Sequence, residues 1–364
     1  MTTTTERDTH TAGDADTGRA RSTQSTRRTG RAAGRGLAAH QEREAGAPGV
    51  TREAYRDRLM ELLPDDPRLM CLDTDTGLFG PRHTEAAGER YVNLGIAEHN
   101  LMGIAAGLAS LGRMPFVNTM AGFASARALE AVKVDIAYPE LPVRIMATHG
   151  GLAAGHLGPT HQALEDLTVM RALPTMTVVV PADAAATAGV VEQSRDLPGP
   201  MYVRLGRKAT PAVPCDEPAV IGRAQLLRPG TDVVLVGCGP HPVTACTEAA
   251  ELLAARGVSA CVLNMHTLRP LDTETLLGAS ADASLVVTVE EHWRSGGLGG
   301  AVCEALAETR PTRVLRIGMP DRFSDTAGSQ QYLLDRYGIT AERTAATVME
   351  ALEGPAAGRA PAGT

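Results

Sequence analysis

The sequence predicts an α/β fold made of two doubly wound domains, and three observations support this prediction. From Thr51 onward, short apolar runs alternate with longer amphipathic segments, a pattern typical of a parallel sheet with crossover helices. The alternation restarts after the proline-rich stretch RKATPAVPCDEP, residues 207–218, which indicates a boundary between two units. The length of 364 residues accommodates two or three domains of ordinary size.

Each predicted element follows from its apolar pattern. In the first unit, short apolar runs such as LMCLD and MYVRL predict strands at residues 69–73, 90–94, 114–119, 142–148, 176–181 and 201–205. The segments between them predict helices at residues 51–63, 97–111, 123–137, 162–171 and 183–194. In the second unit we expect strands at residues 231–236, 259–263, 284–289 and 312–317, and helices at 241–256, 272–279 and 298–308.

These elements divide the chain into five regions. We predict a disordered tail at residues 1–48, a first domain at 49–208, a linker at 209–224, a second domain at 225–355 and a disordered tail at 356–364. The N-terminal tail has no aromatic residue and consists mainly of Thr, Arg, Ala, Gly and acidic residues, so it cannot bury enough apolar surface to offset the entropy of ordering. Its acidic residues also argue against a transit peptide.

The composition excludes several classes of partner. A net charge of −7 and a hydrophobic content of 43% are those of an ordinary globular protein, so we expect no nucleic-acid partner. No apolar run approaches the roughly 20 residues that span a bilayer, and no signal peptide opens the chain, so we expect no membrane partner and a cytoplasmic protein. The six cysteines form no CxxC pair and indicate reduced structural thiols.

Glu98 is the first candidate for chemistry. The apolar residues after it recur at helical spacing, so Glu98 falls in the first turn of a helix, where the helix dipole favours any carboxylate. Its many Gly and Ala neighbours allow close backbone approach and indicate a tight apolar interface, which raises a carboxyl pKa and invites a specific partner. From the residues alone, both a structural first-turn acid and a functional acid remain open.

The segment NLGIAEHNLMGIAAGLA, residues 93–109, resembles the part of transketolases and deoxyxylulose-phosphate synthases that carries their catalytic glutamate. The resemblance implies that the cofactor is thiamine diphosphate and that Glu98 bonds a ring nitrogen of its aminopyrimidine. It also places Ile96 at the cofactor. We therefore expect Glu98 to be both catalytic and cofactor-binding.

The segment FVNTMAGFASARALEAVKVDIAY, residues 116–138, resembles the family region whose aromatic side chains line the pyrimidine pocket. Phe123 stands where a ring would stack on the cofactor, although Phe is also a common core residue. Met120 replaces another aromatic residue of the family, so we expect an altered pocket there. In the turn DTDTG, residues 73–77, Asp75 is the candidate for a position near the partner chain's cofactor site, and a turn-forming role is the alternative.

The segment ATHGGLAAGHLGPTHQALEDL, residues 147–167, resembles the family loop that brings histidines to the substrate. The resemblance makes His149 and His161 catalytic and adds His149 to the substrate-phosphate ligands. A metal site that also includes His156 is the alternative, but no carboxylate or thiolate stands at ligand spacing, so we expect no metal ligand here. Leu157 replaces an acid of the family that is associated with recognising substrate hydroxyls.

Two arginines complete the expected phosphate site. The segment MYVRLGRKATP resembles the end of the family's pyrimidine-binding domain, where Arg207 matches a ligand of the substrate phosphate. Arg52 is a second, weaker match. Arginine binds phosphate through paired hydrogen bonds, so we expect a sugar phosphate as partner. For both Arg207 and Arg52, the alternative is an ordinary solvated surface arginine.

The sequence contains no Gly-Asp-Gly motif, which in the family holds Mg²⁺ and the cofactor diphosphate. The chain therefore resembles the C-terminal half of a split transketolase, with Mg²⁺ bound mainly by a separate N-terminal subunit. The resemblance implies a heterotetramer in which this chain also dimerises, and transfer of a two-carbon ketol unit from a ketose phosphate to an aldose phosphate. Alternatives are a deoxyxylulose-phosphate synthase-like enzyme, the beta component of a 2-oxoacid dehydrogenase and a non-catalytic regulatory partner.

Overall fold

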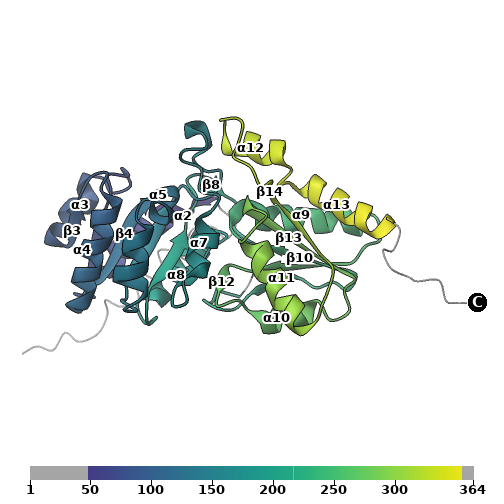
Figure 1. Ribbon diagram of the computed structural model, residues 1–364, viewed down its shortest axis with the longest axis horizontal. Helices are drawn as coiled ribbons and strands as arrows, with labels where there is room; N and C mark the ends of the chain where they lie inside the picture. Colours follow the sequence, from purple (N-terminus) through teal and green to yellow (C-terminus); the bar gives the residue numbers. More distant parts are fainter. Residues whose placement is uncertain (1–47, 216, 355–364) are drawn as a thin grey trace, which may run out of the picture. The chain divides into compact units, whose positions relative to one another are not determined.

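The first sheet carries the predicted parallel strands. The structure, a computed structural model, describes residues 48–215 and 217–354, and within them seven strands pair in the order β12, β6, β7, β5, β4, β2, β3 (Figure 1). Their bounds are β2 Leu69–Asp73, β3 Tyr91–Asn93, β4 Met114–Met120, β5 Arg144–Thr148, β6 Thr177–Val179, β7 Met201–Arg204 and β12 Thr267–Arg269. All neighbours are parallel except β12, which runs antiparallel to β6. The tails predicted at 1–48 and 356–364 lie outside the described residues, apart from Pro48.

Helices cover both faces of this sheet. Their bounds are α2 Thr51–Leu62, α3 Pro81–Ala87, α4 Glu98–Ser110, α5 Ala121–Ser125, α6 Leu129–Ala131, a π-helix at Val132–Ala137, α7 Asp166–Ala172 and α8 Ala184–Ser194. Side chains alternate along each strand, so Cys71 packs with α2 and α8 on one face while Leu72 packs with α4 on the other. The apolar residues of the strands are therefore buried on both faces, as a doubly wound sheet requires.

The second sheet has five strands in the described residues, in the order β14, β13, β10, β11, β9. Their bounds are β9 Gln225–Arg228, β10 Val233–Gly237, β11 Ala260–Asn264, β13 Leu285–Trp293 and β14 Val314–Met319. The helices are α9 Pro240–Ala254, α10 Thr273–Ala279, α11 Leu298–Thr309, α12 Gln330–Tyr337 and α13 Ala341–Glu353. A short antiparallel pair, β1 Gly49–Val50 with β8 Ala209–Thr210, joins the start of the first domain to residues predicted as linker.

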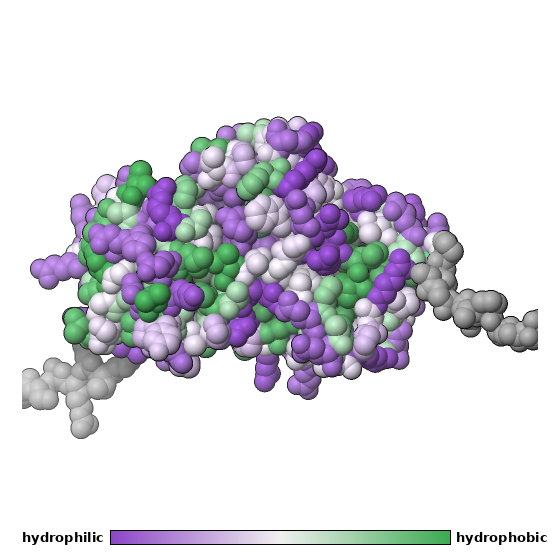
Figure 2. Space-filling model, in the orientation of Figure 1, coloured by the Kyte–Doolittle hydropathy of each residue, from purple (hydrophilic) through white to green (hydrophobic). Residues whose placement is uncertain are grey.

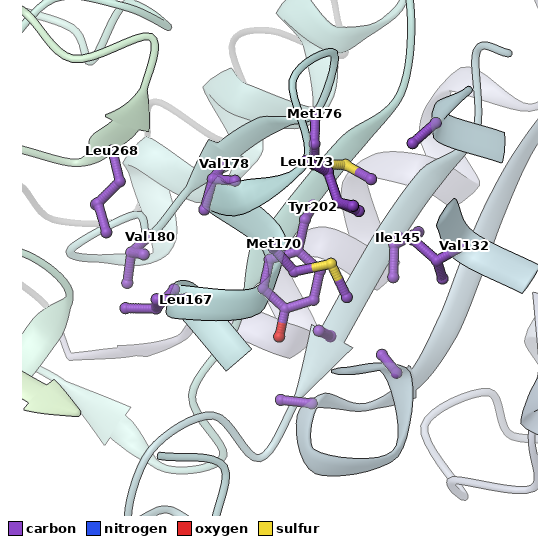
Figure 3. Close-up of a cluster of buried hydrophobic side chains, with 14 of the residues drawn as sticks. Val132, Ile145, Leu167, Met170, Leu173, Met176, Val178, Val180, Tyr202 and Leu268 are labelled. Atoms are coloured by element: carbon purple, nitrogen blue, oxygen red, sulfur yellow. The ribbon is translucent and has the colours of Figure 1, made fainter. Parts of the chain in front are cut away.

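A shared hydrophobic core connects the two sheets. Figure 3 shows Leu167, Met170, Val178, Val180 and Leu268 within one cluster of buried side chains. Leu268 belongs to β12, which follows the second sheet's β11 in sequence but completes the first sheet. The two α/β regions are thus joined by a strand as well as by packing.

Two predicted helices differ from the structure. The single helix predicted at 123–137 is divided into α5, α6 and the π-helix, with a turn around Ala126. The helix predicted at 162–171 begins only at Asp166, because the preceding residues bond elsewhere, as when Ala163 exchanges backbone hydrogen bonds with Gly151. The sequence patterns gave no prediction for β1, β8, β9, β12, α3 and α12, which have at most eight residues each, or for the 13-residue helix α13. No helix in the described ranges is both long and apolar enough to cross a membrane.

Candidate active site at the carboxyl edge of the first sheet

Parallel strands bring the predicted site residues to one edge. Strands β3, β2, β4, β5 and β7 are consecutive neighbours, all parallel, so their carboxyl ends lie along the same edge of the sheet. The segments that carry Asp75, Glu98, Phe123, His149 and Arg207 each follow one of these ends. Arg52 joins them from α2, where the neighbouring Thr51 accepts a hydrogen bond from the Gly206 backbone N–H at 2.8 Å. In an open α/β sheet this edge is the usual place for a ligand.

Glu98 is the first residue of α4 and only 2% exposed. Gly95, with a φ of 66° that favours glycine, makes the turn from β3 into this helix. Its backbone N–H donates to Asn93 Oδ1 at 2.8 Å, which fixes the turn. The carboxylate is paired by Arg127, whose Nη1 lies 2.6 Å from Glu98 Oε2. Within the described ranges, Glu98 is therefore a buried carboxylate paired with one half-exposed cation.

Arg127 is a site residue that the sequence analysis missed. Its guanidinium lies 4.4 Å from the centre of the Phe123 ring, and the Phe123 ring meets His161 edge-on at 5.2 Å between centres. Glu98, Arg127, Phe123 and His161 thus form one chain of contacts along the sheet edge. The division of the predicted 123–137 helix around Ala126 accompanies this arrangement.

Three other predicted cofactor residues take different positions. Met120 ends β4 and is half-buried. Ile96 lies in the turn before α4 and is 75% exposed, an unusual state for a large apolar side chain. Asp75 is exposed and has a φ of 61° in the turn after β2.

Asp73, next to the predicted Asp75, is the buried acid of that turn. Its Oδ1 accepts from Asn118 Nδ2 at 2.8 Å and from Thr76 Oγ1 at 3.0 Å, and its Oδ2 accepts from the Tyr91 hydroxyl at 3.0 Å. All of its partners come from this turn and from neighbouring strands β3 and β4. Asp73 therefore holds the turn in place and leaves Asp75 facing solvent.

Cations gather at the other end of the edge. Burial, together with the positive charges of Arg52 and Arg207 and the proximity of His161, lowers the pKa of His149 to about 4. Burial and the charge of Arg207 also lower the pKa of Arg52. Arg52 Nε is buried without a hydrogen-bond partner, and neither arginine has an ion pair with a carboxylate in the described part of the chain. The structure thus brings together the four residues predicted to bind substrate, and two of them are arginines without an ion pair in the described part of the chain.

The His149 ring is oriented by its own strand. Its Nδ1 lies 3.0 Å from Thr148 Oγ1, which also donates to the Thr119 carbonyl of the next strand at 3.2 Å. His149 itself has a φ of 59°, a left-handed conformation that is uncommon outside glycine. Because its pKa is so low, the imidazole is neutral near pH 7 and can both donate and accept a hydrogen bond.

Buried ionic groups support residues 149–165, the loop between β5 and α7 that carries both histidines and is called the histidine loop below. Arg204 donates to the carbonyl of Ala163 and lies 3.1 Å from Asp166 Oδ2, to which the Tyr202 hydroxyl also donates at 2.7 Å. From the second domain, Glu291 Oε1 accepts from the Leu152 backbone N–H at 2.8 Å. The loop is therefore anchored from both sheets, while Leu157 at its tip is half-exposed.

Two known family models match consecutive segments of this chain. The family model described as "Transketolase, pyrimidine binding domain" matches residues 49–213, and that of "Transketolase, C-terminal domain" matches residues 222–344. The chain belongs to the transketolase family. It is similar to 6-deoxy-6-sulfo-D-fructose transketolase subunit SqwH of a Clostridium species, with 36% identity covering 83% of this chain and 94% of that protein.

Two further members of the transketolase family cover almost the same span. One of the subunits of the apulose-4-phosphate transketolase from Phocaeicola vulgatus is 38% identical over 82% of this chain and 96% of its own length. A solved structure described as a split gene transketolase, inactive beta4 tetramer, is 43% identical, with a TM-score of 0.76 over 83% of this chain and 98% of that one. The described fold is thus that of the C-terminal subunits of split transketolases.

The residues fit one half of the cofactor site of the transketolase family. A buried carboxylate and a half-buried aromatic ring at the sheet edge suit a pyrimidine that needs one polar contact and a stacking surface. Among residues 48–215 and 217–354, no group of three or more His, Cys, Asp or Glu side chains could hold a metal ion.

Proposed function

We propose that this chain is the C-terminal subunit of a thiamine diphosphate-dependent split transketolase, which transfers a two-carbon ketol unit from a ketose phosphate to an aldose phosphate. The observation that carries the proposal is the placement of a buried carboxylate, Glu98, and a cationic cluster, formed by Arg52 and Arg207 beside His149 and His161, on the same sheet edge. The first suits a cofactor ring, and the second suits the phosphate of a sugar. Either alone would be compatible with many functions.

In this proposal Glu98 bonds the aminopyrimidine ring and exchanges a proton with it, while Phe123 stacks against its face. Met120 and Ile96 supply apolar contacts, and Asp75 lies toward the partner chain. When bound, thiamine diphosphate supplies the nucleophilic carbon and the electron sink for cleavage of the carbon–carbon bond. Arg127 balances the charge of Glu98 until the cofactor ring takes over part of that role.

At the other end of the edge, Arg207 and Arg52 bind the substrate phosphate, which relieves the repulsion between their charges. The charges of both arginines contribute to the low pKa of His149. A bound phosphate dianion would offset these charges and raise the pKa of His149 toward the neutral range. His149 can then hydrogen-bond the phosphate or the sugar oxygens. His161, held against Phe123, is placed to pass protons to and from the substrate oxygens.

The remaining half of the site comes from an N-terminal subunit that binds the diphosphate and Mg²⁺. Exposed apolar residues support such an interface: Ile96 and Leu111 flank α4, and Val134 and Tyr138 lie on or next to the π-helix that packs against it. Figure 2 shows hydrophobic residues among hydrophilic ones over the region where α3 and α4 lie. The related beta tetramer is described as inactive, which agrees with a chain that holds half a site. A heterotetramer with this chain dimerised is the assembly we propose.

The substrates belong to a specialised sugar pathway in this proposal. Two similar proteins are named for transfer with a sulfonated fructose and with apulose 4-phosphate, which are not sugars of central metabolism. Leu157, where the family has an acid, lies half-exposed in the loop that carries both histidines. An apolar side chain there removes a partner for sugar hydroxyls, so the preferred substrate should have fewer hydroxyls or different ones at that point.

Reconstitution tests the proposal. The purified chain is mixed with an N-terminal subunit that contains Gly-Asp-Gly, with thiamine diphosphate and Mg²⁺, and ketol transfer between sugar phosphates is assayed. We expect activity only when both subunits and the cofactor are present. Activity of this chain alone would contradict the split-site proposal. Pyruvate-dependent decarboxylation without ketol transfer would instead favour a synthase-like or dehydrogenase-like enzyme, and neither reaction would favour a regulatory role.

A further inference from the structure

A cavity lies beside the loop that carries His149 and His161. It has a volume of about 280 Å³, large enough for a small organic ligand. Its walls come from the loop segment after Gly158 and from two segments of the second domain, and the residues that matter most are Gln162, Glu165, Trp293 and Phe323. None of the residues proposed above for cofactor or phosphate lines it.

Gln162 gives this cavity its polar character. The side chain is 4% exposed, yet neither its Nε2 nor its Oε1 has a hydrogen-bond partner in the described part of the chain. A carboxamide offers two donors and an acceptor with two lone pairs, and buried polar groups in proteins are normally paired. Since Gln162 lines the cavity, a ligand there with both donors and acceptors would satisfy it.

Two aromatic rings form the opposite wall. The Trp293 and Phe323 rings meet edge-on, with 5.7 Å between centres, and Phe323 is 72% exposed. The indole N–H of Trp293 is already used, because it donates to the Arg322 carbonyl at 3.2 Å. What the two rings offer a ligand is therefore apolar surface rather than further hydrogen bonds.

The charges of the lining indicate the class of ligand. No Arg, Lys or His is among the described residues that line the cavity, so it lacks the groups that bind phosphate. Glu165 is the only ionisable side chain there, and burial, with the nearby charge of Asp166, raises its pKa. Its carboxyl group can accept hydrogen bonds and is easier to protonate than usual. Apolar ring surface beside uncharged donors and acceptors suits the C–H and O–H groups of a neutral sugar.

We propose that this cavity binds an unphosphorylated sugar or polyol, whose hydroxyls pair with Gln162 and Glu165 and whose C–H groups lie against Trp293 and Phe323. The site is distinct from the cationic cluster, which takes the phosphorylated substrate. Gln162 directly follows His161, so a ligand that pairs with the carboxamide also restrains the backbone that carries this histidine. The effect on His161 rests on the proposed function, whereas the binding itself does not.

Trp293 makes the binding measurable, because it is the only tryptophan in the chain. The full chain is titrated with D-ribose and with xylitol while its tryptophan fluorescence is recorded. We expect a saturable change in wild type. For Gln162→Leu we expect an affinity at least about tenfold weaker, because the leucine cannot pair with a hydroxyl. Gln331→Leu, the same chemical change at an exposed residue of α12, should bind as wild type does.

Thermal unfolding of the three proteins separates binding from folding. Gln162→Leu removes an unpaired buried amide, so without sugar we expect it to unfold at the same temperature as wild type or higher. Sugar should raise the unfolding temperature of wild type and of Gln331→Leu but not that of Gln162→Leu. If Gln162→Leu is misfolded, Phe323→Ala provides the second variant, because it removes ring surface from an exposed position, and it should lose most of the sugar-induced rise.

Four results would overturn the proposal. They are no saturable change in wild type, an equal change in Gln162→Leu, a change seen only with D-ribose 5-phosphate and lost in Arg207→Gln, and a change that follows protein concentration rather than sugar. The third would assign the signal to the phosphate site, and the fourth to a second copy covering the cavity. None requires turnover, so a failure here is distinguishable from a failure of the proposed transketolase activity.

Discussion

The carboxyl edges of the two sheets are built alike but are used differently. In the second sheet, the two glutamates near the end of β13 are buried and paired. Glu290 accepts from the backbone N–H groups of Leu298 and Gly299 at the start of α11, at 2.7 and 2.8 Å, and Glu291 accepts from Leu152 and from Gln330 Nε2, both at 2.8 Å. In the first sheet, Arg52 and Arg207 gather with His149 and His161, and neither arginine has a carboxylate partner in the described ranges.

This difference shows that the topology supplies a place for chemistry but not the chemistry itself. The second edge uses its carboxylates to hold a helix terminus and the histidine loop, so it contributes rigidity. The first edge keeps like charges close together, an arrangement that is unfavourable in the free chain and favourable when an anion binds. We therefore expect the unpaired arginines of the first edge to bind an anion, and the paired glutamates of the second edge to stabilise the fold.

Among substitutions at the carboxyl edge of the first sheet, Glu98→Gln should lower turnover most. The amide keeps the shape of the side chain but cannot exchange a proton with the cofactor ring, so turnover of the reconstituted enzyme should fall by about 10²- to 10⁴-fold. Glu130→Gln, the same change at an exposed residue nearby, should stay within about twofold of wild type. Near-normal turnover of Glu98→Gln with cofactor still bound would remove Glu98 from the mechanism.

Arg207→Gln should weaken recognition of the phosphate rather than the chemistry. We expect KM for a phosphorylated donor to rise about 10- to 100-fold, the value of a charged hydrogen bond, with a much smaller change in kcat. Arg52→Gln should have an effect in the same direction, and Arg343→Gln on the exposed face of α13 should have none. An equal loss with an unphosphorylated donor would show that Arg207 does not contact the phosphate.

The low pKa of His149 should appear as pH-dependent stability. The folded chain protonates this histidine only near pH 4, whereas the unfolded chain protonates it near pH 6.5, so lowering the pH favours unfolding. Between pH 7 and pH 5 the contribution is about 2 kcal/mol of unfolding free energy. Denaturant unfolding at both pH values should therefore show a smaller loss for His149→Gln than for wild type. Equal losses would contradict the burial of a neutral imidazole.

Glu291→Gln should affect the second edge modestly. The amide oxygen still accepts a hydrogen bond, but the charge that strengthens both bonds is lost, so the unfolding free energy should fall by about 1 kcal/mol. Because Leu152 lies in the histidine loop, proteolysis of that loop should become faster as well. Glu308→Gln on the surface of α11 is the matched control. A large loss of turnover with unchanged stability would instead place Glu291 in the chemistry.

The fold was largely predictable because its central strands are continuous apolar runs. The strand predicted at 69–73 agrees with β2, since residues buried on both faces leave a clear signal. The antiparallel edge strand β12 has no recognisable sequence signal, because it has three residues and it pairs with β6, a distant segment of the chain. The break around Ala126 was equally hidden, because the surrounding residues are good helix formers and tertiary contacts decide the outcome.

The candidate site was predictable only where a local motif marked it. Glu98 and His149 stand in recognisable segments, but Arg127 is 29 residues from its partner Glu98 and no pattern of spacing joins them. The Asp73, Asn118 and Tyr91 network likewise spans three strands and appears only when they pair. Unpaired groups such as Gln162 are the hardest to foresee, because lacking a partner is a property of the folded surroundings.

Strand β12 bears on any attempt to dissect the protein. Thr267–Arg269 covers the free edge of β6, and Leu268 fills the core beneath it. Cutting the chain in the linker before residue 225 would uncover a flat row of backbone donors and acceptors beside an apolar hollow, which is the surface that promotes aggregation. The two family domains are therefore separable in sequence but are best expressed, engineered and transplanted as a single piece.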